Sequence, residues 1–184
     1  MEYLKYFQYN AVVILSYFFI SLLVLWLSHL TKGKSNKLFM TGRGSIFNPI
    51  TYIRMFTHIL GHSNWNHFKN NFLYILLIGP MIEEKYGSIN LLIMILITGF
   101  VTALINIIIS KKQILGASGI VYMLILLSSL VNIESGKIPL TLILIFIFYI
   151  VTEFKDGLFK KDNISHLSHI IGAICGFIYG FYIF

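Results

Sequence analysis

The sequence has few charged residues and almost no cysteine or proline for its length. Of 184 residues, 11% are charged, only seven are acidic, three are prolines and one is a cysteine. A soluble domain carries about a quarter charged residues, so this composition excludes an ordinary soluble fold. A single cysteine excludes an internal disulfide and says nothing about the redox compartment. The shortage of carboxylates also restricts which side chains could perform acid–base chemistry.

Hydrophobic residues make up 57% of the chain and are gathered in runs separated by polar segments. A spanning helix needs about 20 mostly apolar residues, and Ala11 to Leu30 and Ile89 to Ile109 meet that requirement. The other predicted spans begin near Asn66, Ser118, Ile138 and Ser165. We therefore expect an all-α polytopic membrane protein with six transmembrane helices, in which residues 1–184 form one domain.

The net charge of +7 comes mainly from lysines and arginines in the connecting loops. Attraction to a membrane surface explains this charge, because the sequence has no basic helix and no aromatic–basic motif typical of nucleic-acid binding. We expect membrane lipid as a partner and no nucleic acid.

A short turn, Gly116-x-Ser118-Gly119, precedes the fourth apolar run. The two glycines allow a tight turn that leaves the Ser118 hydroxyl uncovered. The start of a helix also offers free backbone N–H groups, which favour a developing negative charge. Ser118 is therefore a candidate nucleophile. The alternative is a serine that caps the helix, with glycines that serve only close packing.

A base for Ser118 must be a histidine, because every carboxylate lies outside the apolar runs or at their ends. His169 is the best candidate, since it precedes Gly172 and Gly176 in the sixth run. Glycines spaced by four form a smooth stripe for close helix contact, which would bring His169 near a neighbouring helix. No buried Asp or Glu is expected to orient the imidazole, so the sequence predicts a Ser–His dyad.

Three further residues have spacings that suit supporting roles. Tyr122 lies four residues after Ser118, on the same helix face, and could hold the imidazole by packing. His67 and Asn71 also share one face, in a polar segment at the start of the second span. Their side chains suit an oxyanion site, together with the backbone N–H of Ser118.

Four motifs occur in a fixed order along the chain: His67-x-x-x-Asn71, Glu83-x-x-x-Gly87, Gly116-x-Ser118-Gly119 and His169-x-x-Gly172-x-x-x-Gly176. With six predicted spans, they resemble the rhomboid intramembrane serine proteases over nearly the whole chain. The resemblance implies a six-helix bundle and an endopeptidase that cleaves transmembrane segments of single-span membrane proteins. It also implies that Ser118 is the nucleophile, His169 the base and Tyr122 its stacking partner, with His67 and Asn71 at the oxyanion.

The same resemblance implies how the protein lies in the membrane. Residues 31–57 would lie partly embedded at the membrane surface, and residues 138–163 would gate lateral access of substrate. We expect a prokaryotic cell membrane with both termini cytoplasmic, and neither a metal nor a cofactor. The sequence departs from the family in having Ile53 before Arg54, where a tryptophan is common, and Ser168 before the histidine, where alanine is common. His166 is an additional histidine one turn away.

The same residues could in principle serve several other functions. His58, His62 and His67 could hold a metal, but the sequence has no His-Glu-x-x-His motif of a zinc protease. Asp156 and Asp162 share one predicted loop, which excludes an aspartyl intramembrane protease. Nothing indicates the paired broken helices of a transporter. The remaining alternative is a catalytically inactive relative that binds membrane proteins without cleaving them.

Overall fold

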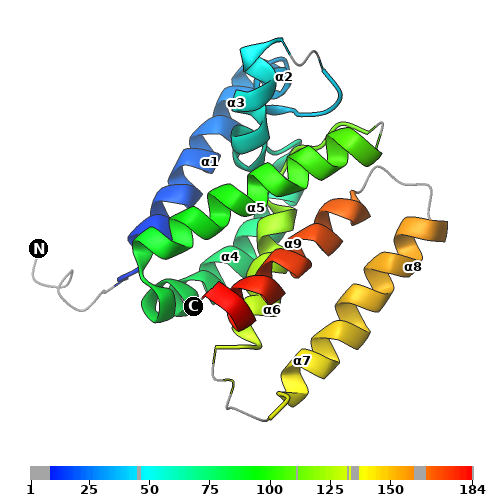
Figure 1. Ribbon diagram of the computed structural model, residues 1–184. Coiled ribbons are helices and arrows are strands. Elements are labelled where there is room, and N and C mark those ends of the chain that lie inside the picture. The colour runs from blue at the N-terminus through cyan, green and yellow to red at the C-terminus, as the bar shows by residue number, and fades with distance from the viewer. Residues whose placement is uncertain are drawn as a thin grey trace, which may run out of the picture.

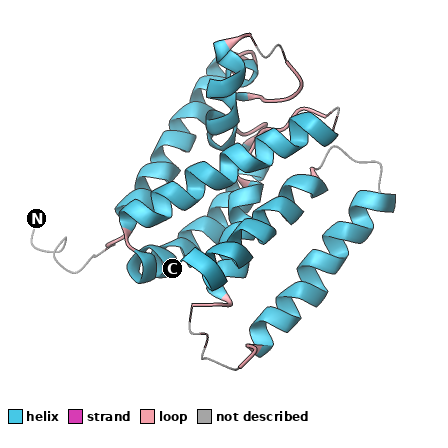
Figure 2. Cartoon of the chain, in the orientation of Figure 1, coloured by secondary structure: helices cyan, strands magenta, loops and turns pink. Residues whose placement is uncertain are grey.

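The computed structural model describes residues 9–44, 47–110, 112–131, 133, 137–159 and 165–183. Within these ranges every regular element is a helix, as Figure 2 shows. One isolated bridge, between Thr41 and Ile114, pairs extended backbone segments. The predicted all-α fold class is confirmed.

The helices follow one another in chain order (Figure 1). They are α1 (Val12–Leu30), α2 (Asn36–Phe39), α3 (Pro49–Thr57), a 3-10 turn (His58–Leu60), α4 (Trp65–Tyr86), α5 (Ser88–Ile109), α6 (Ser118–Ser128), α7 (Leu140–Ile145), a π-helical segment (Phe146–Ile150), α8 (Val151–Phe159), α9 (His166–Ile178) and a second π-helical segment (Tyr179–Ile183). Helical segments therefore occupy all six predicted positions. Phe184, the predicted end of the sixth, lies outside the described residues.

Two predicted boundaries were wrong. The fourth helix was expected to continue to about Ile133, but α6 ends at Ser128. The fifth was expected to end at Thr152, whereas α8 carries it on to Phe159. Charged residues mark where a chain can leave the apolar part of a membrane, but they do not stop a helix, since Glu and Lys are good helix formers.

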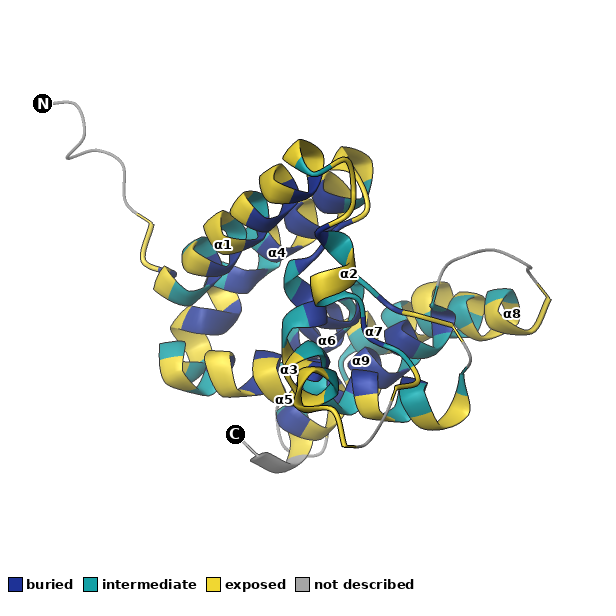
Figure 3. Cartoon of the chain, turned by 90° about the horizontal axis from the view of Figure 1, so that it is seen from above, coloured by how far each residue is buried: buried dark blue, intermediate teal, exposed yellow. Residues whose placement is uncertain are grey.

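Exposed residues occur along most of the helices (Figure 3), and many of them are large and apolar. Leu23, Leu77, Ile89 and Ile108 each leave more than 60% of their area uncovered. Extensive exposed apolar surface fits contact with lipid and is unusual for a soluble monomer. Of the described helices, α1 and α5 are long and apolar enough to cross a membrane by themselves.

Helix α6 forms the centre of the bundle. It is apolar on every side, and Ile120, Met123, Leu124 and Leu127 are completely or almost completely buried. A helix that is hydrophobic all round must be surrounded by other elements. The core formed around it includes side chains from α1, α4, α5 and α9.

The glycines of α9 lie against the backbone of α6, as predicted from their spacing. A methyl group on Gly172 would overlap the carbonyl of Gly119, and one on Gly176 would overlap the carbonyl of Met123. Larger residues would hold the two helices apart. The glycine stripe therefore sets the distance between α6 and α9.

A carboxylate joins α1 to the corner between α4 and α5. The two oxygens of Glu83 accept hydrogen bonds from the backbone N–H groups of Val13 and Ile14, at 2.9 and 3.0 Å. The hydroxyl of Ser88 donates a third, at 2.6 Å. Glu83 thus caps the N-terminus of α1, whose first amides have no partner within the helix. Gly87, with φ of +83°, makes the turn that follows.

Helices α7 and α8, with the π-helical segment between them, form one continuous rod along the side of the bundle (Figure 1). None of the described residues in this rod is buried. An apolar cavity of about 380 Å³ lies between it and helices α6 and α9. The rod is the most loosely packed of the long helical segments described.

Candidate active site

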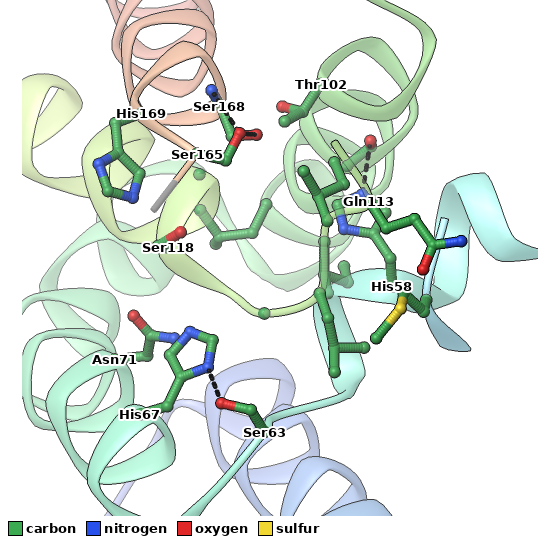
Figure 4. Close-up of a pocket in the computed structure, with 18 of the residues that line it drawn as sticks. His58, Ser63, His67, Asn71, Thr102, Gln113, Ser118, Ser165, Ser168 and His169 are labelled. Atoms are coloured by element: carbon green, nitrogen blue, oxygen red, sulfur yellow. Dashed lines mark hydrogen bonds between the residues drawn. The ribbon is translucent and has the colours of Figure 1, made fainter. Parts of the chain in front are cut away.

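A cavity of about 710 Å³ opens among α4, α5, α6, α9 and the turn that follows α3. It brings together polar residues that are distant in the sequence, as Figure 4 shows. Ser118, His169, His67 and Asn71 all line it, together with Thr102 of α5. With Gly116 and Gly119, six of the predicted site residues therefore line one cavity.

Ser118 is the first residue of α6, and its side chain points into the cavity (Figure 4). The capping position is occupied by Ala117, whose side chain makes no capping hydrogen bond. The alternative in which Ser118 serves as the helix cap is therefore wrong. Gly116 has φ of +129°, and a Cβ there would lie 2.6 Å from the His67 ring. This turn requires glycine for its conformation and for the close approach of His67.

His169 lies in the first turns of α9 and is 8% exposed. Its ring stacks on Tyr122 of α6, with centroids 4.4 Å apart and planes 9° apart. The predicted stacking of these two rings is thus present. Ser168, one of the departures from the family pattern, bonds to the hydroxyl of Ser165 at 2.7 Å and lines the cavity.

The expectation that no carboxylate orients His169 was wrong. Glu153 of α8 lies 2.8 Å from the Nδ1 atom of His169, measured from Oε2. The same oxygen lies 2.6 Å from Nδ1 of His166, and the hydroxyl of Tyr122 donates to the other oxygen, Oε1. The sequence gives little sign of this role, because Glu153 follows the fifth apolar run, where the charged residues predict a loop. His166, the additional histidine, is buried.

His67 and Asn71 face Ser118 from the opposite wall of the cavity (Figure 4). Nδ1 of His67 bonds to the hydroxyl of Ser63 at 3.1 Å. The amide nitrogen of Asn71 is buried without a hydrogen-bond partner. Leaving a buried donor unpaired costs free energy. The Asn71 amide is therefore well suited to donate a hydrogen bond to an acceptor oxygen of a bound substrate.

The segment before α4 fixes the serine turn. The backbone N–H of Gly116 donates to the carbonyl of His58 at 3.0 Å, and Thr41 pairs with Ile114 just before it. Nε2 of His58 bonds in turn to the carbonyl of Gly99 in α5, at 3.0 Å. These bonds attach the turn to α5 and to the polar segment that lines the cavity.

The histidines of this segment form no metal site of the kind considered from the sequence. His62 is fully buried beneath His67, with ring centroids 5.0 Å apart, and does not line the cavity. Among the described residues, the one group whose ligand atoms all lie within 4.8 Å is Glu153, His166 and His169. Direct hydrogen bonds already join the members of that group.

Comparison with known proteins shows the family of this chain. Residues 49–184 match the model of the Rhomboid domain, which covers α3 to the end of the chain. The chain belongs to the rhomboid family. Rhomboid proteins are embedded in membranes, in keeping with the apolar surface of this bundle.

Curated relatives include proteins from bacteria and plants. Rhomboid protease GlpG of Haemophilus influenzae is 27% identical over 131 residues, which cover 70% of this chain and 68% of GlpG. Rhomboid-like protein 11, chloroplastic, of Arabidopsis thaliana is 24% identical over 132 residues, covering 64% of this chain and 47% of that protein. RHOMBOID-like protein 1 of Arabidopsis thaliana is 32% identical over 135 residues, covering 70% and 33%. The chain thus spans about half or less of the length of the two plant relatives.

Proposed function

We propose that this rhomboid-family protein is an intramembrane serine endopeptidase that cleaves transmembrane segments of other membrane proteins. The observation that carries the proposal is that Ser118 and His169 face one cavity from two helices in backbone contact. An unpaired amide of Asn71 lies in the same cavity. A nucleophile, a base and an oxyanion donor are the groups that acyl transfer requires.

In the proposed reaction, Oγ of Ser118 attacks the carbonyl carbon of the scissile peptide. Nε2 of His169 takes the hydroxyl proton and then gives it to the nitrogen of the leaving amine, as the C–N bond breaks. The acyl-enzyme is hydrolysed by a water molecule, which His169 activates in the same way. This water would reach Ser118 through the polar side of the cavity, where Ser63 and Asn70 lie.

The negative oxygen of the tetrahedral intermediate needs hydrogen-bond donors. The backbone N–H of Ser118, at the start of α6, has no acceptor within the helix. Nδ2 of Asn71 and the ring of His67 lie across the cavity and would supply the others. These donors are held in place before substrate binds, so no reorganisation is needed as charge develops.

The substrates would be single-span membrane proteins. Their transmembrane helix must unwind at the cleavage point, because a formed helix keeps its peptide groups hydrogen-bonded internally. The rod formed by α7 and α8 is the proposed lateral gate, since none of its described residues is buried. A cell membrane with cytoplasmic termini remains our proposed location.

The proposal is tested with a fluorophosphonate probe and a model transmembrane substrate, both in detergent and in liposomes. Wild type should be labelled and should cleave, whereas Ser118→Ala should do neither while keeping its thermal stability. Ser128→Ala, at the far end of the same helix, is the matched control and should behave as wild type. His169→Ala should also abolish cleavage, and combining it with Ser118→Ala should add nothing, because the pair acts as a unit.

The alternative function, a non-cleaving protein that binds membrane proteins, makes the opposite prediction. A wild-type protein that captures transmembrane helices without labelling or cleavage would favour it. Cleavage that persists in Ser118→Ala would overturn the proposed nucleophile.

A further inference from the structure

A partly buried network of hydrogen bonds joins the gate helix to the base of the proposed dyad. Glu153 lies in the first turn of α8, and its carboxylate crosses to α9 and α6. It accepts from both histidines of α9 through Oε2 and from Tyr122 through Oε1. The side chain of Glu153 is 13% exposed and that of His169 is 10% exposed, so little water competes for these bonds.

The bond to Glu153 defines which nitrogen of His169 carries the proton. An ionised carboxylate can only accept hydrogen bonds, so Nδ1 of His169 must donate. In a neutral imidazole, Nε2 is then the unprotonated nitrogen. That tautomer is the one that can take a proton from the hydroxyl of Ser118. A ring protonated on Nε2 could not act as its base.

The carboxylate of Glu153 also places a negative charge beside the ring of His169. When His169 takes the serine proton, the ring becomes positively charged while its side chain is only 10% exposed. A negative carboxylate 2.8 Å away favours that charged form, and the favourable interaction is stronger in a medium of low dielectric. Three donors around Glu153 in turn stabilise its ionised state.

Two neighbours fix the orientation of the network. Tyr122 both stacks on the ring of His169 and donates to Glu153, so one side chain sets the plane of the imidazole and the position of its partner. His166 lies edge-on to His169, with centroids 6.1 Å apart, and shares the same carboxylate oxygen.

We propose that Glu153 is a positioning residue that turns the Ser118–His169 dyad into a Ser–His–Glu arrangement whose third member is carried by the gate helix. The inference rests on the proposed protease function. Because Glu153 belongs to α8 and His169 to α9, the base is correctly oriented only while α8 lies against α9. Peptide-bond cleavage is thereby coupled to the closed position of the rod.

The first test is kinetic and uses Glu153→Gln, which keeps the size of the side chain and removes its charge. We expect kcat on the model substrate to fall by roughly 100-fold, with KM changed by less than about twofold, because the lost interaction matters in the transition state. Thr152→Ala alters the adjacent, exposed position of α8 and should leave both constants unchanged. All assays contain EDTA, so that a divalent ion cannot replace the hydrogen bonds.

The second test measures the tautomer directly and does not depend on activity. In protein labelled with ¹⁵N-histidine, the ring of neutral His169 should carry its proton on Nδ1. In Glu153→Leu, which is folded if its other histidine signals are retained, a substantial fraction should move to Nε2. Glu153→Asp should restore part of the wild-type signal and part of kcat.

Three results would overturn the inference. One is a Glu153→Gln enzyme as fast as wild type while Ser118→Ala is inactive, which would leave the protease proposal intact. Another is a higher kcat in Glu153→Gln, which would make the carboxylate a restraint on the gate. The third is a wild-type His169 protonated on Nε2. If instead wild type never cleaves but His169 shows the expected tautomer, the protease proposal fails and the assigned geometry stands.

Discussion

Gly172 packs against the backbone carbonyl of Gly119, with no space for a methyl group between them. Gly119 directly follows Ser118, and Gly172 comes three residues after His169. A single backbone contact therefore lies beside both members of the proposed dyad. Any residue that separates α6 from α9 at this point also separates the nucleophile from the base.

Replacing Gly172 should disable the enzyme without removing a chemical group. Gly172→Ala forces the two helices apart, and overpacking of this kind costs about 1–3 kcal/mol. We expect at least a roughly tenfold loss of cleavage rate, because small misplacements of reacting groups are costly. Ile174→Ala, two residues away and 53% exposed, is the control for changes in α9 itself. Wild-type rates in Gly172→Ala would mean that the helix contact does not set the dyad geometry.

Asn71 should matter for turnover more than for labelling. Its unpaired amide is placed to donate to the oxyanion, and loss of one such donor costs about 100- to 1,000-fold in kcat. Asn71→Ala should therefore cleave slowly, while Ser118 still reacts with a fluorophosphonate on a longer time scale. Asn66→Ala changes an exposed amide in the same helix and should have no effect. Unchanged turnover in Asn71→Ala would assign this amide to structure.

The buried histidines between α3 and α4 predict a loss of stability in acid. Burial lowers the pKa of His58 to about 4, although the hydrogen bond to the carbonyl of Gly99 acts in the opposite direction and raises the pKa. Burial and the neighbouring His67 lower the pKa of His62 to about 3. The folded protein thus binds fewer protons than the unfolded chain between about pH 6.5 and 4. Stability should be greatest above pH 6.5 and fall progressively as the pH is lowered through this window.

Thermal unfolding in detergent between pH 7 and pH 4 measures this effect. His58→Gln should lower the melting temperature at pH 7, yet reduce its dependence on pH, because one of the two buried sites is gone. His29→Gln, at an exposed position, should leave the pH dependence of the melting temperature as in wild type. A melting temperature that does not change from pH 7 to pH 4 in wild type would contradict the prediction.

Orientation in the membrane is a point on which loop charge and family arrangement disagree. With cytoplasmic termini, the segments that follow the first, third and fifth apolar runs of the sequence lie outside and hold most of the basic residues: Lys32, Lys34, Lys37, Arg43, Arg54, Lys111, Lys112, Lys155, Lys160 and Lys161. Lys5, Lys85 and Lys137 remain on the cytoplasmic side. The positive-inside rule favours the reverse orientation, although long loops weaken it. Lys5, Lys111, Lys160 and Lys161 lie outside the described residues.

We expect the family orientation, because the long segment between α1 and α4 is folded against the bundle rather than free in a loop. Its Arg54 donates to the carbonyl of Leu38, and Arg43 donates to the carbonyls at the end of α5. A fluorescent protein fused after Phe184, of a kind that matures only in the cytoplasm, should be bright. A dark fusion with an active exported phosphatase at the same position would reverse the assignment.

The spacing of apolar residues, glycines and polar residues along the sequence predicted much of the fold and of the candidate site. The 20-residue apolar runs indicated α1 and α5, and glycines spaced by four indicated the contact between α9 and α6. Neighbours four residues apart, such as His67 and Asn71, share a helix face in any helix, so their convergence followed from local geometry.

The role of Glu153 could not be predicted in this way. Its contact with His169 requires that the helix continue beyond the apolar run and that α8 pack against α9. No local sequence pattern predicts either feature. The available signal was that Glu153 is the first carboxylate after the fifth run, only 16 residues before His169. Charge at this point predicts the end of a span, although a carboxylate that accepts hydrogen bonds from three donors can lie largely out of contact with water.

The bond between Glu83 and the first turn of α1 defines how much of the chain must fold together. The match to the Rhomboid domain begins at residue 49, but α1 precedes it and holds Ile14 and Tyr17 in the same core. A fragment that starts at residue 49 would leave Glu83 without its two amide donors and would open the apolar face on which α1 rests. The cooperative folding unit is therefore larger than the region of family similarity, and truncation to that region should yield an aggregating protein rather than a minimal protease.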